Sequence, residues 1–124
     1  MKKLILLFHF LLGVWPALAE TALLNLARQQ AAGGKLPEAI VSYQKILKAI
    51  PQKDPQREMV MAELIYALYS QKEYEKTIDQ ALNFLRTYRQ SNFGFNISYI
   101  MAAAEFGLDR YKDAFAIFSG FPFD

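Results

Sequence analysis

Few side chains of this 124-residue sequence could carry out catalysis. The only histidine is His9, which lies in an apolar N-terminal segment, and there is no cysteine. Past that segment the chain therefore lacks Cys–His and Ser–His nucleophilic pairs, and it lacks the usual zinc ligands. We predict no catalytic residue, no metal site and no cofactor.

Carboxylates are the remaining candidates for acid–base chemistry. Glu73 and Glu75, and likewise Asp109 and Asp113, fall beside turns at which helices are expected to begin. Acidic residues near a helix N-terminus interact favourably with the helix dipole, so we interpret these side chains as capping and solvated groups. No glycine-rich phosphate loop is present, and Gly33-Gly34 is read as a helix-ending turn. The sequence predicts a protein that is not an enzyme.

The N-terminus has the pattern of a secretory signal peptide. Lys2 and Lys3 precede an apolar run over 4–14, and Ala17-Leu18-Ala19 provides small residues at the expected cleavage site. We expect cleavage after Ala19 and a periplasmic product; the alternative is an uncleaved anchor helix. Residues 20–124 then form one domain of 105 residues, with 12 basic and 12 acidic side chains. This balance gives no electrostatic footprint for nucleic acid.

A turn followed by the start of a helix occurs three times, at 34–40, 72–78 and 109–115. The small residues Ala39, Thr77 and Ala114 take equivalent places, 38 and 37 residues apart, near the roughly 34-residue period of tetratricopeptide (TPR) repeats. The pattern predicts an all-α, TPR-like right-handed solenoid of about three antiparallel helix pairs, preceded by the signal peptide. The repeats are expected at about 20–53, 58–91 and 95–124, with helices over 21–33, 37–49, 58–70, 75–88, 96–106 and 111–119.

The helix expected around 59–69 carries a single charge, Glu63, so it should be packed between neighbours on several sides. It is too short to span a membrane, which needs about 20 residues. In this second unit the core is predicted to consist of Met61, Leu64, Ile65 and Leu68 facing Ile78, Ala81, Leu82 and Leu85.

One face of the same helix is a candidate binding surface. Met59, Ala62, Tyr66 and Tyr69 follow one another at steps of three, four and three, so they share a face. The corresponding residues of the neighbouring units are Leu24, Arg28, Asn96, Tyr99 and Ala103. Tyrosine suits recognition because it combines an apolar ring with a polar tip, and Arg28 could hold a carboxylate by two hydrogen bonds. We predict a concave groove whose peptide- or partner-binding residues are Arg28, Met59, Ala62, Tyr66, Tyr69 and Tyr99. The alternative is that the tyrosines belong to the core and Arg28 is merely solvated.

The C-terminal end is unusually aromatic. Solenoids normally finish on a polar face, whereas this sequence finishes on Phe115, Phe118, Phe121 and Phe123. Burying one such side chain is worth roughly 1.5–3 kcal/mol. We expect the tail to fold back, to meet a partner or a second copy, or to continue in a longer array of repeats.

Two segments resemble one known family. Leu64–Tyr69 (Leu-Ile-Tyr-Ala-Leu-Tyr) and Asn96–Met101 (Asn-Ile-Ser-Tyr-Ile-Met) are similar, in the same order, to the second and third repeats of BamD, a lipoprotein of the outer-membrane β-barrel assembly machinery. The likeness covers about 22–108. Two features depart from the family: there is no lipobox cysteine, and the chain has fewer than the family's five or so repeats. The resemblance implies a periplasmic, peptide-binding module equivalent to the N-terminal half.

The leading functional hypothesis is a non-catalytic periplasmic TPR protein that binds peptide segments or partner subunits during outer-membrane protein assembly. It would be peripheral to the outer membrane if it associates with it. The alternative is a cell-envelope scaffold that self-associates, for example as a homodimer, through its aromatic C-terminal end.

Overall fold

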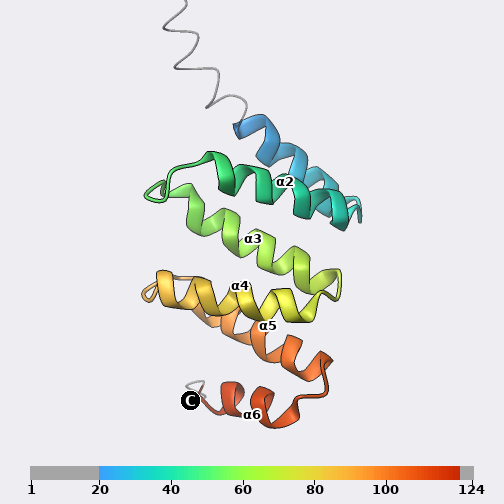
Figure 1. Cartoon of the computed structure of the whole chain (residues 1–124), viewed down its shortest axis with the longest axis vertical. Coiled ribbons are helices and arrows are strands. Elements are labelled where there is room, and N and C mark those ends of the chain that lie inside the picture. The colour runs from blue at the N-terminus through green and yellow to red at the C-terminus, as the bar shows by residue number, and fades with distance from the viewer. Residues whose placement is uncertain (1–19, 121–124) are drawn as a thin grey trace, which may run out of the picture.

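The computed structural model describes residues 20–120, which form a stack of antiparallel helices (Figure 1). These residues contain six helices and no strand: 20–32, α2 (Leu36–Ala49), α3 (Gln56–Ser70), α4 (Tyr74–Thr87), α5 (Gly94–Gly107) and α6 (Tyr111–Ser119). The helices follow one another along the long axis of the molecule in chain order. The predicted all-α fold of stacked helix pairs is confirmed.

The same turn joins the two helices of each pair. Its left-handed residue is Gly34 (φ 78°), Lys72 (φ 64°) or Asp109 (φ 62°), at spacings of 38 and 37 residues. The next residue in each turn donates its N–H to a carbonyl five residues earlier, at 2.8–3.0 Å, which satisfies one of the free carbonyls at the end of the first helix. A repeated backbone geometry thus underlies the repeated sequence.

Two hydrophobic clusters form the core, and α3 contributes to both. Val60, Leu64, Ala67 and Leu68 pack with helix 20–32 and α2. Met61 and Ile65 pack with α4 and α5. An α-helix that meets neighbours on two sides has few positions left for polar residues, which accounts for the nearly uncharged composition of this segment.

Small residues allow close helix approach where the chain reverses. Ala27 and Ala39 are fully buried between the first two helices, as are Thr77 and Ala102 in the later pairs. Gly107, at the end of α5, lies against the Tyr74 ring; a Cβ atom added there would be 2.5 Å from Cε2 of that ring. This glycine is required by packing rather than by its backbone conformation.

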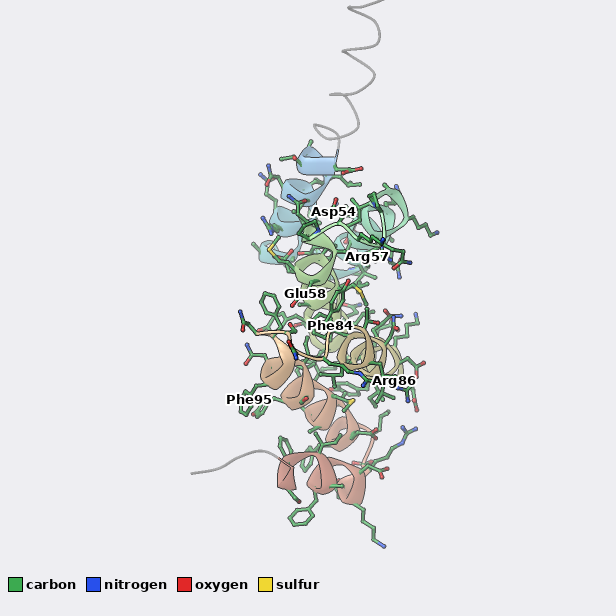
Figure 2. The ribbon with its side chains drawn as sticks, turned by 90° about the vertical axis from the view of Figure 1, so that its left-hand side faces the viewer. Asp54, Arg57, Glu58, Phe84, Arg86 and Phe95 are labelled. Atoms are coloured by element: carbon green, nitrogen blue, oxygen red, sulfur yellow. The ribbon has the colours of Figure 1, made fainter. Side chains whose placement is uncertain are left out.

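One predicted core position is wrong. Leu82 is 37% exposed, whereas Phe84, which was not predicted, is fully buried in the second cluster (Figure 2). Because α4 buries Thr77, Ile78, Ala81 and Phe84, its inward face is rotated away from the predicted stripe that continued through Leu82 to the half-buried Leu85.

The connector between α2 and α3 is fixed by polar contacts. Arg57 donates to the carbonyl oxygens of Leu47 (2.7 Å) and Ile50 (3.3 Å), so its guanidinium satisfies the C-terminal end of α2. The Asp54 carboxylate accepts the backbone N–H of Gln56 (2.8 Å) at the start of α3 (Figure 2). These contacts fix the approach of the second helix pair to the first.

None of the helices within 20–120 combines the length and the apolar character needed to cross a membrane. The predicted signal peptide, 1–19, lies outside the described residues, as do Phe121 and Phe123.

Candidate functional site

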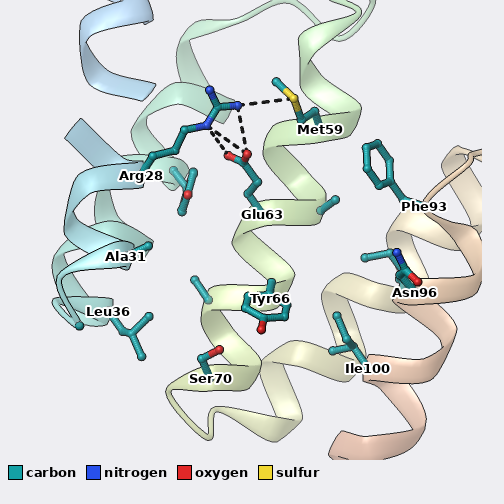
Figure 3. Close-up of a pocket in the computed structure, with 15 residues that line it drawn as sticks. Arg28, Ala31, Leu36, Met59, Glu63, Tyr66, Ser70, Phe93, Asn96 and Ile100 are labelled. Atoms are coloured by element: carbon teal, nitrogen blue, oxygen red, sulfur yellow. Dashed lines mark hydrogen bonds and ion pairs between the residues drawn. The ribbon is translucent and has the colours of Figure 1, made fainter. Parts of the chain in front are cut away.

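A groove of about 610 Å³ lies over α3, between helix 20–32 on one side and α5 on the other (Figure 3). Its floor is one face of α3: Met59, Ala62, Glu63, Tyr66, Ala67 and Ser70. The start of α5 forms one wall with Phe93, Asn96, Ile97 and Ile100. The opposite side is formed by Arg28, Ala31, Gly34, Leu36 and Tyr43.

The floor follows from helix periodicity. Met59, Glu63, Tyr66 and Ser70 recur at steps of four, three and four, so their side chains leave the helix on one side. The other buried residues of α3 in the two core clusters lie outside this floor, and Ala67 belongs to both the floor and the first cluster. Ala62, with its single methyl group, leaves space between the larger side chains of the floor. Most of the lining is apolar, which is typical of ligand sites in which a few polar groups determine orientation.

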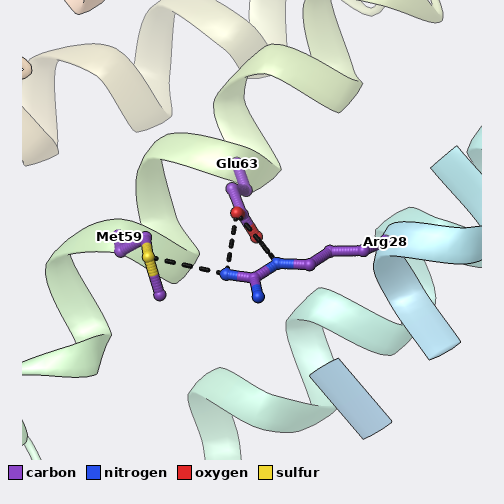
Figure 4. A network of polar contacts seen from close by, with 3 residues as sticks. All are labelled: Arg28, Met59 and Glu63. Carbon is purple, nitrogen blue, oxygen red and sulfur yellow. Dashed lines mark hydrogen bonds and ion pairs between the residues drawn. The ribbon is translucent and has the colours of Figure 1, made fainter. Parts of the chain in front are cut away.

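An ion pair crosses one end of the groove (Figures 3 and 4). Arg28 Nε lies 3.1 and 3.3 Å from the two carboxylate oxygens of Glu63, and Nη2 lies 3.0 Å from Oε1. Nη2 also points to Sδ of Met59 at 3.5 Å. The side chains are 42% and 29% exposed, so the pair contributes only about 0.2–1 kcal/mol to stability. The ion pair also connects the first helix pair to the second, because Arg28 lies in helix 20–32 and Glu63 in α3.

Tyr43 adds a neutral polar group beside this pair. Burial, the negative charge of Glu63 and a hydrogen bond to its carboxylate together raise the pKa of the Tyr43 hydroxyl to about 12, although Arg28 acts in the opposite direction. The hydroxyl is therefore protonated at neutral pH and donates to Glu63. One carboxylate thus interacts with a cation and a phenol, and the three groups together carry no net charge.

The structure brings four of the six predicted binding residues to this groove: Arg28, Met59, Ala62 and Tyr66. Tyr66 is 62% exposed, so its ring is open to solvent rather than sealed in the core. Tyr69 and Tyr99 do not line the groove. The ring of Tyr69 packs against Tyr74 with centroids 5.8 Å apart, and the ring of Tyr99 packs edge-on against Phe118 at 5.6 Å.

Leu24 was expected on the binding face, and this prediction is wrong. It is buried in the first cluster with Val60 and Leu64, because a leucine beside α3 gains more from contact with apolar side chains than from exposure.

Sequence reasoning missed several lining residues, including Glu63, Phe93 and Ile100. Glu63 could have been found, because it follows Met59 by four residues on the same helix face. Phe93 belongs to the loop that precedes α5, where no helical periodicity indicates which way a side chain points.

The predicted C-terminal aromatic cluster is only partly described. Phe115 is 74% exposed on α6, and Phe118 is half-buried against Tyr99. Three of the four carboxylates considered for catalysis make other contacts: Glu73 pairs with Lys76, Glu75 pairs with Arg110, and Asp109 accepts a hydrogen bond from the Tyr111 hydroxyl. Within the described part of the chain, no group of three or more His, Cys, Asp or Glu side chains is placed to hold a metal ion.

Comparison with known proteins assigns the family. The model of the YfiO family, described as outer membrane lipoprotein, matches residues 16–114. The chain belongs to this family. The YfiO match covers the first five helices of the stack and the start of α6, so it includes every residue that lines the groove. Membership confirms the resemblance to BamD-like lipoproteins and assigns the chain to a family of cell-envelope proteins. No curated protein and no solved structure matches the chain.

Proposed function

We propose that this YfiO-family chain is a non-catalytic periplasmic protein whose groove binds peptide segments of outer-membrane protein clients, or of a partner subunit, during outer-membrane protein assembly. The single observation that carries the proposal is the groove itself. It is apolar, it is open to solvent, and it presents an exposed aromatic ring, Tyr66, at its floor.

The shape of the groove suits a peptide rather than a small metabolite. It runs across three helices from successive pairs, and the polar groups at its edges, Arg28, Ser70 and Asn96, are spread over its length. Peptides in such surfaces bind through a few anchoring side chains, with polar contacts that select the orientation. Tyr66 is the expected anchor because tyrosine buries a large area on binding and loses little side-chain freedom.

The test is a binding titration with a synthetic peptide that has the aromatic C-terminal sequence of a porin. Alanine at Tyr66 removes a ring that is 62% exposed in the free protein, so folding should be unaffected. Loss of a central aromatic anchor typically costs about 2 kcal/mol, or roughly thirtyfold in Kd. Tyr111→Ala is the matched control, because Tyr111 is 54% exposed and does not line the groove. Equal affinity in both variants and in the wild type would exclude the groove as the peptide site.

The alternative scaffold function has one observation in its favour, the 74% exposure of Phe115. A self-associating scaffold without a ligand site would show no peptide binding in the same titration.

A further inference from the structure

The sequences of the three helix pairs can be aligned at their left-handed turn residues, Gly34, Lys72 and Asp109. Position i of the first pair then corresponds to i + 38 in the second and i + 75 in the third. Inside the stack, the first helix of each pair packs on the second helix of the preceding pair: α3 on α2, and α5 on α4. At the two ends of the described stack, helix 20–32 and α6 each have a face that is not covered by a described helix. The equivalent faces of α3, α5, α2 and α4 are covered inside the stack.

The N-terminal end exposes a stacking position. Leu64 of α3 and Met101 of α5 are 3% and 9% exposed, because they pack with residues of α2 and α4. Leu26 is their equivalent in helix 20–32 and is 45% exposed. The position is apolar in all three pairs, although within residues 20–120 a neighbouring helix covers it only in the second and third pairs.

A hollow of about 420 Å³ lies beside Leu26, with Gln30, Val41 and Ser42 among its lining. The equivalent residues of the second pair, which include Leu64, Leu68, Asp79 and Gln80, line a similar hollow. There the opposite side is provided by Gln44, Leu47 and Lys48 of α2. At the N-terminal end, no described helix occupies the place that α2 takes in the second pair.

The C-terminal end exposes the matching face. Phe115 of α6 is equivalent to Ile78 of α4, which is 7% exposed in the cluster it forms with Ile97 and Met101 of α5. Phe115 itself is 74% exposed. Among the described residues, no helix follows α6 to cover this face as α5 covers α4.

We propose that copies of this chain stack end to end, with α6 of one copy packing on helix 20–32 of the next, as α2 packs on α3. The second copy is the favoured occupant because Phe115 and Leu26 are equivalent to Ile78 and Met101, which already pack in one cluster between α4 and α5. This association would be independent of the peptide groove, which contains neither Leu26 nor Phe115.

The residues on the exposed face of helix 20–32 are of types that can be buried in this contact. The positions equivalent to Val60, Leu64, Ala67 and Leu68 are Ala22, Leu26, Gln29 and Gln30, so none of these four would bury an ionised group. The charged residues that line the adjacent hollow are Glu38 and Lys45 of α2. Gln30 already accepts a hydrogen bond from the Ser42 hydroxyl at 2.8 Å. Because the two contacting faces differ, the contact is heterologous and leaves a free face at each end of the assembly, so growth continues beyond the dimer.

Sedimentation velocity of the purified protein over a wide concentration range tests the proposal. The wild type should show a weight-average sedimentation coefficient that rises with concentration past the value of a dimer. Leu26→Glu and Phe115→Glu should each remain monomeric, because each loses one of the two faces. An equimolar mixture of the two variants should form a dimer that grows no further, because one intact face of each kind remains.

Leu82→Glu, at a 37% exposed leucine of α4 away from both ends, is the control and should behave as the wild type. Far-UV circular dichroism verifies that each variant is folded, and Leu26→Gln replaces Leu26→Glu if the latter is not. The proposal is overturned if the wild type stays monomeric at every concentration. It is equally overturned if Leu26→Glu dimerises while Phe115→Glu does not, because that pattern indicates a two-fold contact through α6.

Discussion

Replacing Glu63 by glutamine perturbs the polar end of the groove with almost no change in side-chain shape. The substitution removes the charge that holds Arg28, at contacts of 3.0–3.3 Å. Because both side chains are partly solvated, we expect a loss of only about 0.2–1 kcal/mol in the free energy of unfolding. For a domain of this size that corresponds to a fall in Tm of about 1–6 °C.

The same substitution should be visible at Tyr43. Glu63 is one of the causes that raise the Tyr43 pKa to about 12, so Glu63→Gln should lower that pKa, although burial, the largest cause, keeps it above the ordinary value. Because the pKa is raised in the folded state, the stabilisation linked to the protonated hydroxyl is complete below about pH 10. It is lost as the pH rises from about 10 through the folded-state value of about 12. Ultraviolet titration of tyrosine ionisation, with Tyr43→Phe to assign the signal, measures the change.

Two results would contradict this description of the groove. A Tm lowered by far more than the expected few degrees would mean that Glu63 is an essential core contact rather than a partly solvated one. A Tyr43 pKa that does not move would mean that the hydroxyl and the carboxylate are not neighbours in solution.

Two further substitutions test the packing that positions the groove. Phe84→Ala removes a ring that is fully buried in the second cluster and should cost about 3–5 kcal/mol, whereas Leu82→Ala on the same helix should cost far less; equal losses in urea unfolding would contradict the observed rotation of α4. Gly107→Ala places a methyl group against the Tyr74 ring, itself packed on Tyr69, and should destabilise the fold by about 1–3 kcal/mol. Unchanged or increased stability of Gly107→Ala would show that this contact is not close.

The helical stack was predictable because its signals are local and repeated. All six described helices lie within two residues of the predicted bounds, since the turns that separate them recur at nearly constant spacing. The left-handed conformation was recognisable from Gly34 alone. Lys72 and Asp109 take the same conformation without being glycine, and only their equivalence to Gly34 indicates it.

The face of α4 was harder to predict, because two apolar stripes share Ile78 and Ala81. One continues through Leu82 and Leu85, and the other reaches Phe84. Which stripe is buried depends on where α3 and α5 pack against α4. The local sequence of α4 does not indicate the position of these two helices. The repeat relates the two helices, because Phe84 is equivalent to Ile46, which is buried in the core of the first unit.

In the groove, helical periodicity predicted residues of the floor but not the ion pair between Arg28 and Glu63. Met59, Ala62 and Tyr66 share a face by helix geometry alone. The partner of Arg28 is Glu63, 35 residues away, and only the packing of helix 20–32 beside α3 brings the two charges together. Tyr69 is diverted toward Tyr74, an interaction with the following helix that the stripe does not reveal.

Amide chemical-shift mapping during titration with the porin-type peptide tests the central claim most directly. If the groove is the binding site, the largest chemical-shift changes should occur at Met59, Ala62 and Tyr66 on the floor and at Asn96 on the α5 wall. The opposite result is saturable binding whose changes cluster at Leu47, Lys48 and Asp79, in the hollow between α2, α3 and α4, with the groove residues unaffected.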